Sequence, residues 1–197
     1  MHFGERFYTQ EELDKAGFKS LGVGVKIKRN VGLFFTENII IDDYTRIDDF
    51  TIIVASREEV RLGKHVHIGT HVYVSASDGF IAEDFVGISA GTKIFTSSDD
   101  YTGQKLTNST MPRQFIGGPA GRIVLQKHVI IGANCVLLPG VTLGTGTSLG
   151  AMTLVNKSLP PWGIYIGAPA RKLRDRSQKM LEMEKEFLEG ETLKSKT

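Results

Sequence analysis

Three histidines lie close together in the chain, at His65, His67 and His71. Neutral imidazoles are common zinc ligands, so a zinc site built from three histidines is one chemistry that this cluster offers. An imidazole can also act as a general base near neutral pH, and a neighbouring carboxylate would orient the ring and raise its basicity. Metal-assisted and acid–base chemistry are therefore both open to this segment, depending on which side chains the fold brings together.

Basic residues gather toward the C-terminal end of the chain, although the formal net charge of the whole protein is only +2. Arginine and lysine bind phosphate groups through charge-assisted hydrogen bonds. The cluster therefore predicts a binding site for a phosphorylated ligand, with an ordinary solvated surface as the alternative. Its members are Lys157, Arg171, Lys172, Arg174 and Arg176, and only Asp175 opposes them.

The composition argues against several classes of protein. The balance of 24 basic and 22 acidic side chains gives no general reason to expect binding to nucleic acid or to an anionic membrane. No apolar run approaches the roughly 18 to 20 residues of a transmembrane helix, and the acidic N-terminal segment does not resemble a secretory signal. We therefore expect a cytoplasmic protein. Cys135, the single cysteine, lies in an apolar segment, which predicts a small core residue rather than a catalytic thiol.

An aliphatic residue recurs at every sixth position from residue 125 onward, and a small or β-branched residue follows four positions after each of the first five. The same period appears upstream in groups of three, with slips of two or three residues between groups. Neither a helix nor an ordinary strand has a period of six. The predicted inward positions are Ile27, Leu33, Ile39, Ile41, Ile47, Ile53, Leu62, Ile68, Val74, Ala82, Ile88, Ile94, Leu125, Ile131, Leu137, Leu143, Leu149 and Val155.

Each group of three spans 18 residues, the length expected for one turn of a three-sided coil whose sides are short strands. The aliphatic side chains would point inward and stack on those of the next coil, while the backbone pairs with the coils above and below. Residues near the corners would adopt the backbone angles of tight turns. The sequence therefore predicts an all-β protein, a parallel β-helix over residues 20–172.

Both ends of such a rod expose unpaired strand edges, and both carry a predicted helix. At the N-terminus, Thr9 and Glu12 have the spacing of a capping box, which predicts a short helix through about Ala16 within a cap of residues 1–19. At the C-terminus, residues 176–189 predict a helix, within a terminal segment of residues 173–197, that packs on the core or caps the rod. A partner-binding helix is the alternative. Its apolar residues are Met180, Leu181, Met183, Phe187 and Leu188.

One segment, residues 98–122, interrupts the repeat between the sides that contain Ile94 and Leu125. It has no period of six and is rich in glycine, proline, serine, threonine and asparagine. A long excursion from a regular rod is more often functional than accidental, although a plain surface insertion would look the same. We therefore expect this inserted loop to take part in function.

The repeat, the insertion and the ending Gly167-Ala168-Pro169-Ala170-Arg171 together resemble the hexapeptide-repeat acyltransferases, in particular the sugar, galactoside and maltose acetyltransferases. The resemblance covers about residues 20 to 175 and is most specific from residue 129 to residue 171. It implies a left-handed parallel β-helix that assembles into homotrimers, with each active site in a groove between adjacent subunits. It also implies that the protein transfers an acetyl group from acetyl-CoA to a sugar, without a metal.

In that family, acetyl-CoA lies along the C-terminal coils of the rod. Small residues at the coil corners would leave room for the narrow pantetheine arm, and the basic cluster would hold the phosphates of coenzyme A. Carried over by position, the implied acetyl-CoA-binding residues are Ala133, Ala151, Met152, Asn156, Lys157, Pro169 and Arg171.

The general base is where the sequence departs from the family. Those enzymes generally supply a histidine at the start of the insertion, whereas Asp99 stands at that place here and no histidine occurs between Val72 and Lys127. One hypothesis is that His71, beside Asp99 or Asp100, forms the acid–base set. The other is that one of the two aspartates acts alone, which is sufficient for an amine acceptor that loses its proton late in the reaction.

The leading hypothesis is acetyl transfer from acetyl-CoA to an amino or hydroxyl group of a sugar, nucleotide-linked or destined for a surface polysaccharide. O-acetylation of a free sugar or polysaccharide unit is the close alternative. A γ-type carbonic anhydrase would need convergent histidines, whereas His65 and His71 occupy the same corner position on successive sides and should diverge. A non-catalytic scaffold would have no reason to keep both the insertion and the basic ending.

Overall fold

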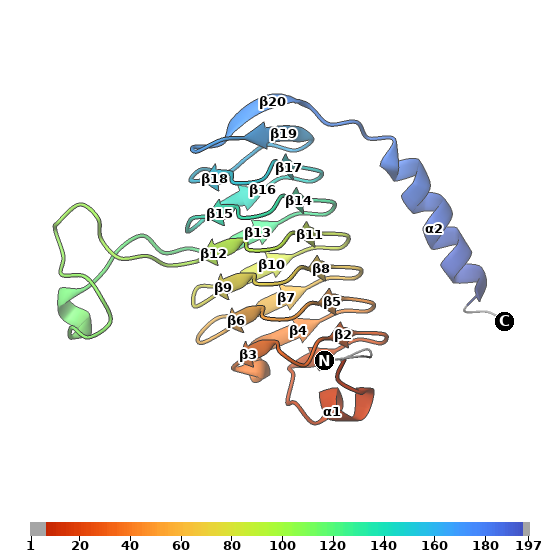
Figure 1. The fold of residues 1–197 in the computed structure, drawn as a ribbon, viewed down its shortest axis with the longest axis horizontal. Coiled ribbons are helices and arrows are strands. Elements are labelled where there is room, and N and C mark those ends of the chain that lie inside the picture. Colours follow the sequence, from red (N-terminus) through yellow and green to blue (C-terminus); the bar gives the residue numbers. More distant parts are fainter. Residues whose placement is uncertain (1–6, 195–197) are drawn as a thin grey trace, which may run out of the picture.

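The computed structural model describes residues 7–194, and it shows a rod of stacked coils from which one arm projects and beside which one helix lies (Figure 1). Each coil contributes three short strands. The strands of successive coils pair into three sheets, which form the faces of a triangular prism. The predicted all-β fold is confirmed, and it is a left-handed parallel β-helix.

The first face consists of β1 (Ser20–Leu21), β4 (Ile39–Ile41), β7 (Val60–Leu62), β10 (Phe80–Ala82), β13 (Ile123–Leu125) and β16 (Thr142–Leu143). The second consists of β2 (Lys26–Ile27), β5 (Arg46–Ile47), β8 (His67–Ile68), β11 (Gly87–Ile88), β14 (Ile130–Ile131), β17 (Ser148–Leu149), β19 (Gly163–Ile166) and β20 (Arg171–Asp175). The third consists of β3 (Gly32–Phe34), β6 (Ile52–Val54), β9 (Tyr73–Ser75), β12 (Lys93–Phe95), β15 (Val136–Leu137) and β18 (Leu154–Val155).

The core of the prism is made of the predicted aliphatic columns. Every predicted inward residue is at most 3% exposed except Leu33, which is half-buried near the N-terminal end. One grouping was wrong: Ile39 and Ile41 lie on the same strand, so the first coil begins with β1 instead, where Leu21 pairs with Ile41. Cys135 is buried as predicted, its thiol donates a hydrogen bond to the carbonyl oxygen of Gly150, and burial raises its pKa.

Two of the three corners carry ladders of residues in the left-handed backbone region, which non-glycine residues seldom adopt. The first corner, between the first and second faces, includes Tyr44, His65, Phe85 and His128, with φ between 55° and 63°. The second corner, between the second and third faces, includes Phe50, His71, Gly91, Asn134 and Met152, with φ between 56° and 75°. The third corner, between the third and first faces, is where residues 98–122 leave the rod as an arm (Figure 1).

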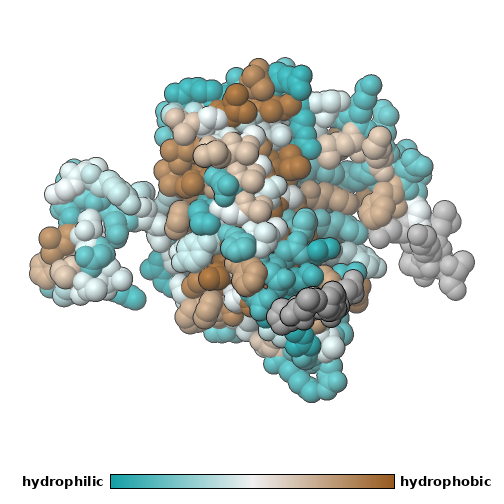
Figure 2. All heavy atoms as spheres, in the orientation of Figure 1, coloured by the Kyte–Doolittle hydropathy of each residue, from teal (hydrophilic) through white to brown (hydrophobic). Residues whose placement is uncertain are grey.

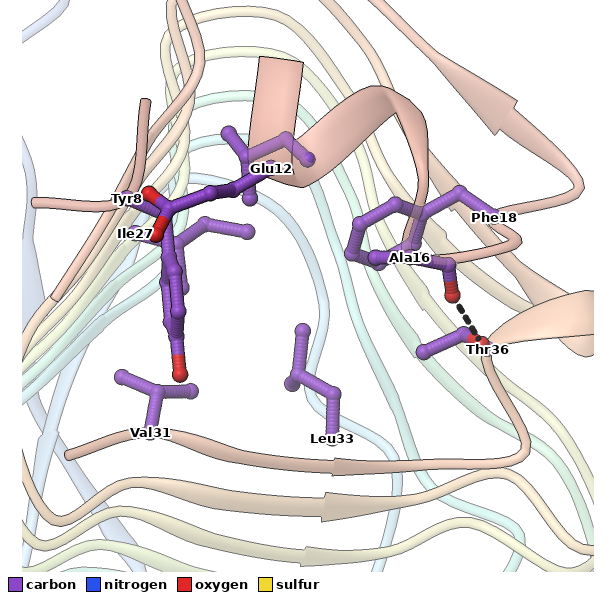
Figure 3. A pocket seen from close by; sticks show the side chains of 9 residues that line it. Tyr8, Glu12, Ala16, Phe18, Ile27, Val31, Leu33 and Thr36 are labelled. Carbon is purple, nitrogen blue, oxygen red and sulfur yellow. Dashed lines mark hydrogen bonds between the residues drawn. The ribbon is translucent and has the colours of Figure 1, made fainter. Parts of the chain in front are cut away.

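The N-terminal end of the rod is closed by α1 (Gln10–Asp14). The predicted capping box is confirmed: the Thr9 side chain accepts from the backbone N–H of Glu12, whose carboxylate accepts from the backbone N–H of Thr9. Leu13 of α1 is buried in the core. A cavity of about 330 Å³ remains between this cap and the first coil, and Figure 3 shows Tyr8, Phe18 and Leu33 around it. A short 3₁₀ turn, Thr36–Asn38, follows β3. The hydroxyl group of Thr36 donates a hydrogen bond to the carbonyl oxygen of Ala16.

The C-terminal end differs from the expectation in two ways. The antiparallel strand β20 runs through the expected boundary at residue 172 and pairs with β19, so a strand covers this edge of the second face. The helix α2 (Met180–Lys194) starts four residues later than expected and lies beside the first corner (Figure 1). The carboxylate of Glu184 contacts Lys127 and, at 2.8 Å, His128 Nε2. No helix in residues 7–194 has the length and apolar character needed to cross a membrane.

Neighbouring residues of β14 provide a direct test of the inward columns. We expect Ile131→Ala, which removes a fully buried side chain, to lower the free energy of unfolding by about 2–5 kcal/mol. Ile130→Ala should lower it by much less, because that side chain faces outward and is 44% exposed. Urea unfolding of both variants measures the difference. Equal losses of stability would show that the two side chains do not face in opposite directions.

Candidate active site

The arm leaves the rod through a narrow neck at the third corner. The backbone N–H of Ser98 donates to the carbonyl of Pro119 at 3.0 Å, and Ser97 bridges to Ala120. Gly118 lies so close to this strand that an ideal Cβ there would approach the Ser98 carbonyl oxygen to 2.1 Å. Only glycine fits such an approach without moving the backbone. Asp99 therefore stands, exposed, at a point where both strands of the neck are tightly held.

Asp100 has a structural role within the arm. Its carboxylate accepts hydrogen bonds from the backbone N–H groups of Thr102, Gln104 and Lys105, and from the Thr102 hydroxyl at 2.6 Å. The Thr102 hydroxyl and these N–H groups lower the pKa of Asp100 to about 2. A carboxylate that is occupied by four donors and so weakly basic is a poor proton acceptor. Of the two aspartates, Asp99 is the one whose carboxylate is available for chemistry.

Beyond the neck the arm stands away from the rod (Figure 1). Leu106 pairs with Ile116 and with Phe115, and a 3₁₀ turn at Arg113–Phe115 lies near the far end. Its larger apolar side chains face outward: Tyr101 is 90% exposed and Phe115 is 49% exposed. The arm is thus internally ordered but does not bury its own apolar groups.

His71 lies on the second corner, one coil below Gly91, as the repeat predicted. Its Nδ1 is 2.7 Å from the hydroxyl of Thr70, and that hydroxyl donates its only proton to the carbonyl of Asp49. We therefore assign the neutral ring a proton on Nδ1, which makes Nε2 a hydrogen-bond acceptor. The ring of Phe50 packs against it with 5.0 Å between centroids.

One chain does not bring His71 and Asp99 together. His71 precedes β9 and Asp99 follows β12, its neighbour in the third face, so the two residues lie at opposite ends of that face. At about 3.3 Å per strand residue, the separation is roughly 15 Å or more. The predicted pair of His71 with Asp99 or Asp100 therefore does not form within a single copy of the protein.

A groove of about 490 Å³ opens where the arm joins the third face. Of the residues implied in acetyl-CoA binding, Asn156 lines it, and Lys157 follows in the chain. The groove has a largely apolar floor with a few polar groups, the character of a small-molecule site. Its lining residues are Phe95, Ser98, Tyr101, Pro119, Leu138, Pro139 and Asn156.

The other implied acetyl-CoA-binding residues lie elsewhere. Ala133, Ala151 and Met152 stack at the second corner, where the backbone N–H of Met152 donates to Ala133, and the Met152 side chain is 74% exposed. Pro169 lies near the C-terminal end of the rod, beside β18, and the exposed Arg171 opens β20. Ala133, Ala151 and Met152 thus share the second corner with His71, whereas Asn156 and Lys157 lie near the third corner, like Asp99.

The basic cluster is smaller than the sequence suggested. Lys172 is paired with Asp175 at 2.6 Å. Arg176 turns inward and donates to the carbonyls of His128 and Gly146, where burial lowers its pKa. The exposed cations that remain are Lys157, Arg171 and Arg174.

The remaining histidines do not converge. His65 and His128 belong to the first corner, and both stack on Phe85. His67 faces outward from the second face, with Nε2 at 2.8 Å from Asp48. Among residues 7–194, no group of three or more histidine, cysteine and acidic side chains is arranged to hold a metal ion. The arrangement that a γ-type carbonic anhydrase would need is thus not formed by these residues within one chain.

Two features of the candidate site were not predicted from the sequence. The first is the apolar lining of the groove from Phe95, Leu138 and Pro139. These residues come one or two positions after inward residues of the third face, so the repeat could have predicted that they lie on the outside of that face. Lys93 was also missed: its ammonium donates to the carbonyls of Gly91 at 2.9 Å and His71 at 3.3 Å.

Comparison with known proteins agrees with this fold. No model of a known protein family matches the sequence. The dTDP-4-amino-4,6-dideoxy-D-glucose acyltransferase of Escherichia coli is 31% identical over 181 residues, which cover 92% of this chain and 94% of that protein. A hexapeptide-repeat acetyltransferase from Vibrio cholerae, 24% identical with a TM-score of 0.57, covers 86% of this chain and 80% of its own, and shares the fold.

The crystal structure of AntD, an N-acyltransferase from Bacillus cereus, superposes with a TM-score of 0.92. The two proteins are 37% identical, and the match covers 96% of this chain and 100% of AntD. That structure contains dTDP and 3-hydroxybutyryl-CoA. The protein therefore belongs to the hexapeptide-repeat acyltransferases, enzymes that move an acyl group from a coenzyme A thioester to an acceptor.

Proposed function

We propose that this protein transfers an acyl group from acyl-CoA to the amino group of a nucleotide-linked amino sugar, with Asp99 as the general base. The observation that carries the proposal is that an aspartate, and no histidine, stands at the neck of the arm beside the groove. Both of the closer relatives support this acceptor: one is an acyltransferase of a dTDP-linked amino sugar, and AntD has also been solved with that sugar nucleotide and coenzyme A.

Spacing within the chain also supports Asp99. AntD has been crystallised as variants at one serine and at one aspartate, ten positions apart in its sequence. Ser89 and Asp99 are separated by the same interval here. Ser89 follows β11 at the edge of the second corner, and its backbone N–H donates to Ile131. We infer that Ser89 and Asp99 face the reacting groups from two different corners.

The proposed reaction moves one proton, in two steps, from the sugar amine to the sulfur of coenzyme A by way of Asp99. The sugar amine attacks the thioester carbonyl, a C–N bond forms, and the nitrogen becomes positively charged. Asp99 accepts the proton from that nitrogen, the C–S bond breaks, and coenzyme A leaves as a thiolate that takes the proton from Asp99 and so restores the carboxylate. The products are the sugar amide and free coenzyme A. A weak base is adequate because the cationic nitrogen is strongly acidic by the time the proton moves.

We further propose that three copies assemble and that each active site lies between two of them. Such a seam would place the third corner of one copy, with Asp99 and the groove, against the second corner of the next, with Ser89, His71 and Ala133. The outward side of the third face supports this, because most of its side chains are apolar. Figure 2 shows apolar groups along this side of the rod. The apolar and aromatic residues that flank the inward positions of this face are Phe34, Ile52, Val54, Tyr73, Phe95, Val136, Leu138 and Leu154.

The donor would lie toward the C-terminal coils, with Ala133, Ala151 and Met152 along the pantetheine arm and Lys157 and Arg171 near the phosphates. We place the reaction in the cytoplasm, where acyl-CoA and nucleotide sugars are made. An N-acylated nucleotide sugar is a glycosyl donor, so the product suits the synthesis of a surface polysaccharide.

The role of the base can be tested by kinetics with dTDP-4-amino-4,6-dideoxyglucose, using acetyl-CoA and 3-hydroxybutyryl-CoA as donors. We expect Asp99→Asn to lower kcat by roughly 10²–10⁴-fold, because the amide cannot accept the proton. His71→Gln, which keeps a hydrogen-bond acceptor, should change kcat little. A large loss of kcat in the His71 variant, together with normal turnover in the Asp99 variant, would transfer the role of base to the imidazole.

Asp100 should behave differently from Asp99. We expect Asp100→Asn to speed hydrogen exchange at the amides of Gln104 and Lys105, because a carboxamide NH₂ cannot accept their hydrogen bonds. The pKa of Asp100 falls from 3.8 to about 2 on folding, so its contribution to stability is present above pH 4 and is lost as the pH drops through 2. Asp99→Asn is the matched control. Unchanged exchange in the Asp100 variant would contradict this role.

The shared site predicts complementation between inactive variants. We expect light scattering to give the mass of three chains. Asp99→Asn and Ala133→Trp should each be inactive alone, the second because the indole fills the second corner. In a mixed trimer, some interfaces combine an unchanged Asp99 from one copy with an unchanged Ala133 from the next. Each of the two is present in half of the copies, so refolding a 1:1 mixture should restore about a quarter of wild-type activity. No recovery in proven mixed trimers would show that each site lies within one chain.

A further inference from the structure

An aromatic pair and an ammonium group lie together at the second corner, toward the N-terminal side of the proposed reaction centre. The rings of Phe50 and His71 pack 5.0 Å apart, and Phe50 is 55% exposed although its φ is 61°. An exposed aromatic side chain on a residue with left-handed backbone angles contributes little to the stability of the fold. Its exposed ring is instead suited to packing against a planar ligand.

Lys93 supplies a positive charge beside this pair. Its ammonium donates to the carbonyls of Gly91 and His71, which hold it at the corner. Within residues 7–190, whose side chains the structure describes, no carboxylate forms an ion pair with it. Two of its three N–H donors are used, so one remains for an anion. A cation that is positioned by neutral groups and lacks a counter-ion is suited to binding phosphate oxygens.

The carboxylates near this corner are already engaged by other groups. Asp49 accepts from the backbone and side-chain amides of Asn30 at 3.3 Å and 3.1 Å. Asp48 is paired with Arg46 at 2.8 Å and with His67 at 2.8 Å, on the second face. The negative charge next to the corner is therefore partly compensated, whereas the charge of Lys93 is not.

The order of these groups along the rod matches the order of parts in a nucleotide sugar. Ser89 is on the fourth coil, Lys93 reaches the carbonyls of the third and fourth, His71 is on the third and Phe50 on the second. Successive coils lie about 4.8 Å apart. In the ligand, the diphosphate stands between the reacting sugar and the base. The donor occupies the coils on the other side of the reaction centre, which leaves this half of the corner to the acceptor.

We propose that Lys93, His71 and Phe50 form the nucleotide subsite of the acceptor. Lys93 binds the diphosphate, the ring of Phe50 stacks on the base, and His71 Nε2 accepts a hydrogen bond from the ligand between them. This inference rests on the proposed function, and it makes His71 a binding residue rather than the general base.

The test is calorimetric titration of dTDP into the intact protein, which needs no chemistry. We expect Phe50→Ala to weaken dTDP binding roughly tenfold through loss of stacking. Lys93→Met should weaken it by about the same factor through loss of a charged hydrogen bond. Tyr44→Ala is the matched control for Phe50, because Tyr44 lies on the same coil at the first corner, is 51% exposed and has φ of 58°. Lys26→Met, on the second face, is the control for Lys93.

Two further readouts separate the possible failures. Coenzyme A should bind to all four variants as it does to the wild type, and its failure to bind the wild type would end the proposed function itself. Pyrophosphate should compete with dTDP less well in Lys93→Met but equally well in Phe50→Ala. Unchanged dTDP affinity in both Phe50→Ala and Lys93→Met, with coenzyme A bound normally, would overturn the subsite and leave the proposed function standing.

Discussion

Stacking of aliphatic side chains into columns inside the prism is the interaction on which the rest of the structure depends. Each column buries Ile, Leu or Val from successive coils, at about 25 cal/mol for each Å² removed from water. Because the backbone pairs only with the coils above and below, no other contact sets the length of a side. The period of six therefore determines both the shape of the rod and the corner on which any residue lies.

This regularity limits where function can be placed. Inward positions are filled by the columns, so chemistry must come from corner residues, from outward positions or from breaks in the repeat. The proposed site draws on all three: His71 and Ser89 at or beside a corner, Lys93 and Phe95 on the outside of a face, and Asp99 in the arm. Residues on one ladder are spaced by the rise between coils, so a long ligand laid along a corner meets them in a fixed order.

The same logic explains what the sequence could predict and what it could not. The inward positions, the capping box and the separation of His65 from His71 follow from local spacing, and the structure confirms them. The role of Asp100 depends on N–H groups two to five residues away in an irregular loop, for which no periodic signal exists. The position of α2 beside the first corner depends on tertiary contacts of Glu184 and Phe187. The proposed pairing between corners of different copies would leave no mark in the spacing of one chain.

The residue at the neck of the arm also bears on which acceptor can react. A hydroxyl group must lose its proton as it attacks, so it needs a base whose pKa is close to neutral, as a histidine provides. An amine attacks with its lone pair and becomes acidic only afterwards, so a carboxylate is basic enough to complete the reaction. With Asp99 as the proposed base, a hydroxyl that reached the groove would meet a carboxylate, which is too weak a base to activate it. Selection of an amine over a hydroxyl would then arise from the strength of the base, even where the two acceptors have the same shape.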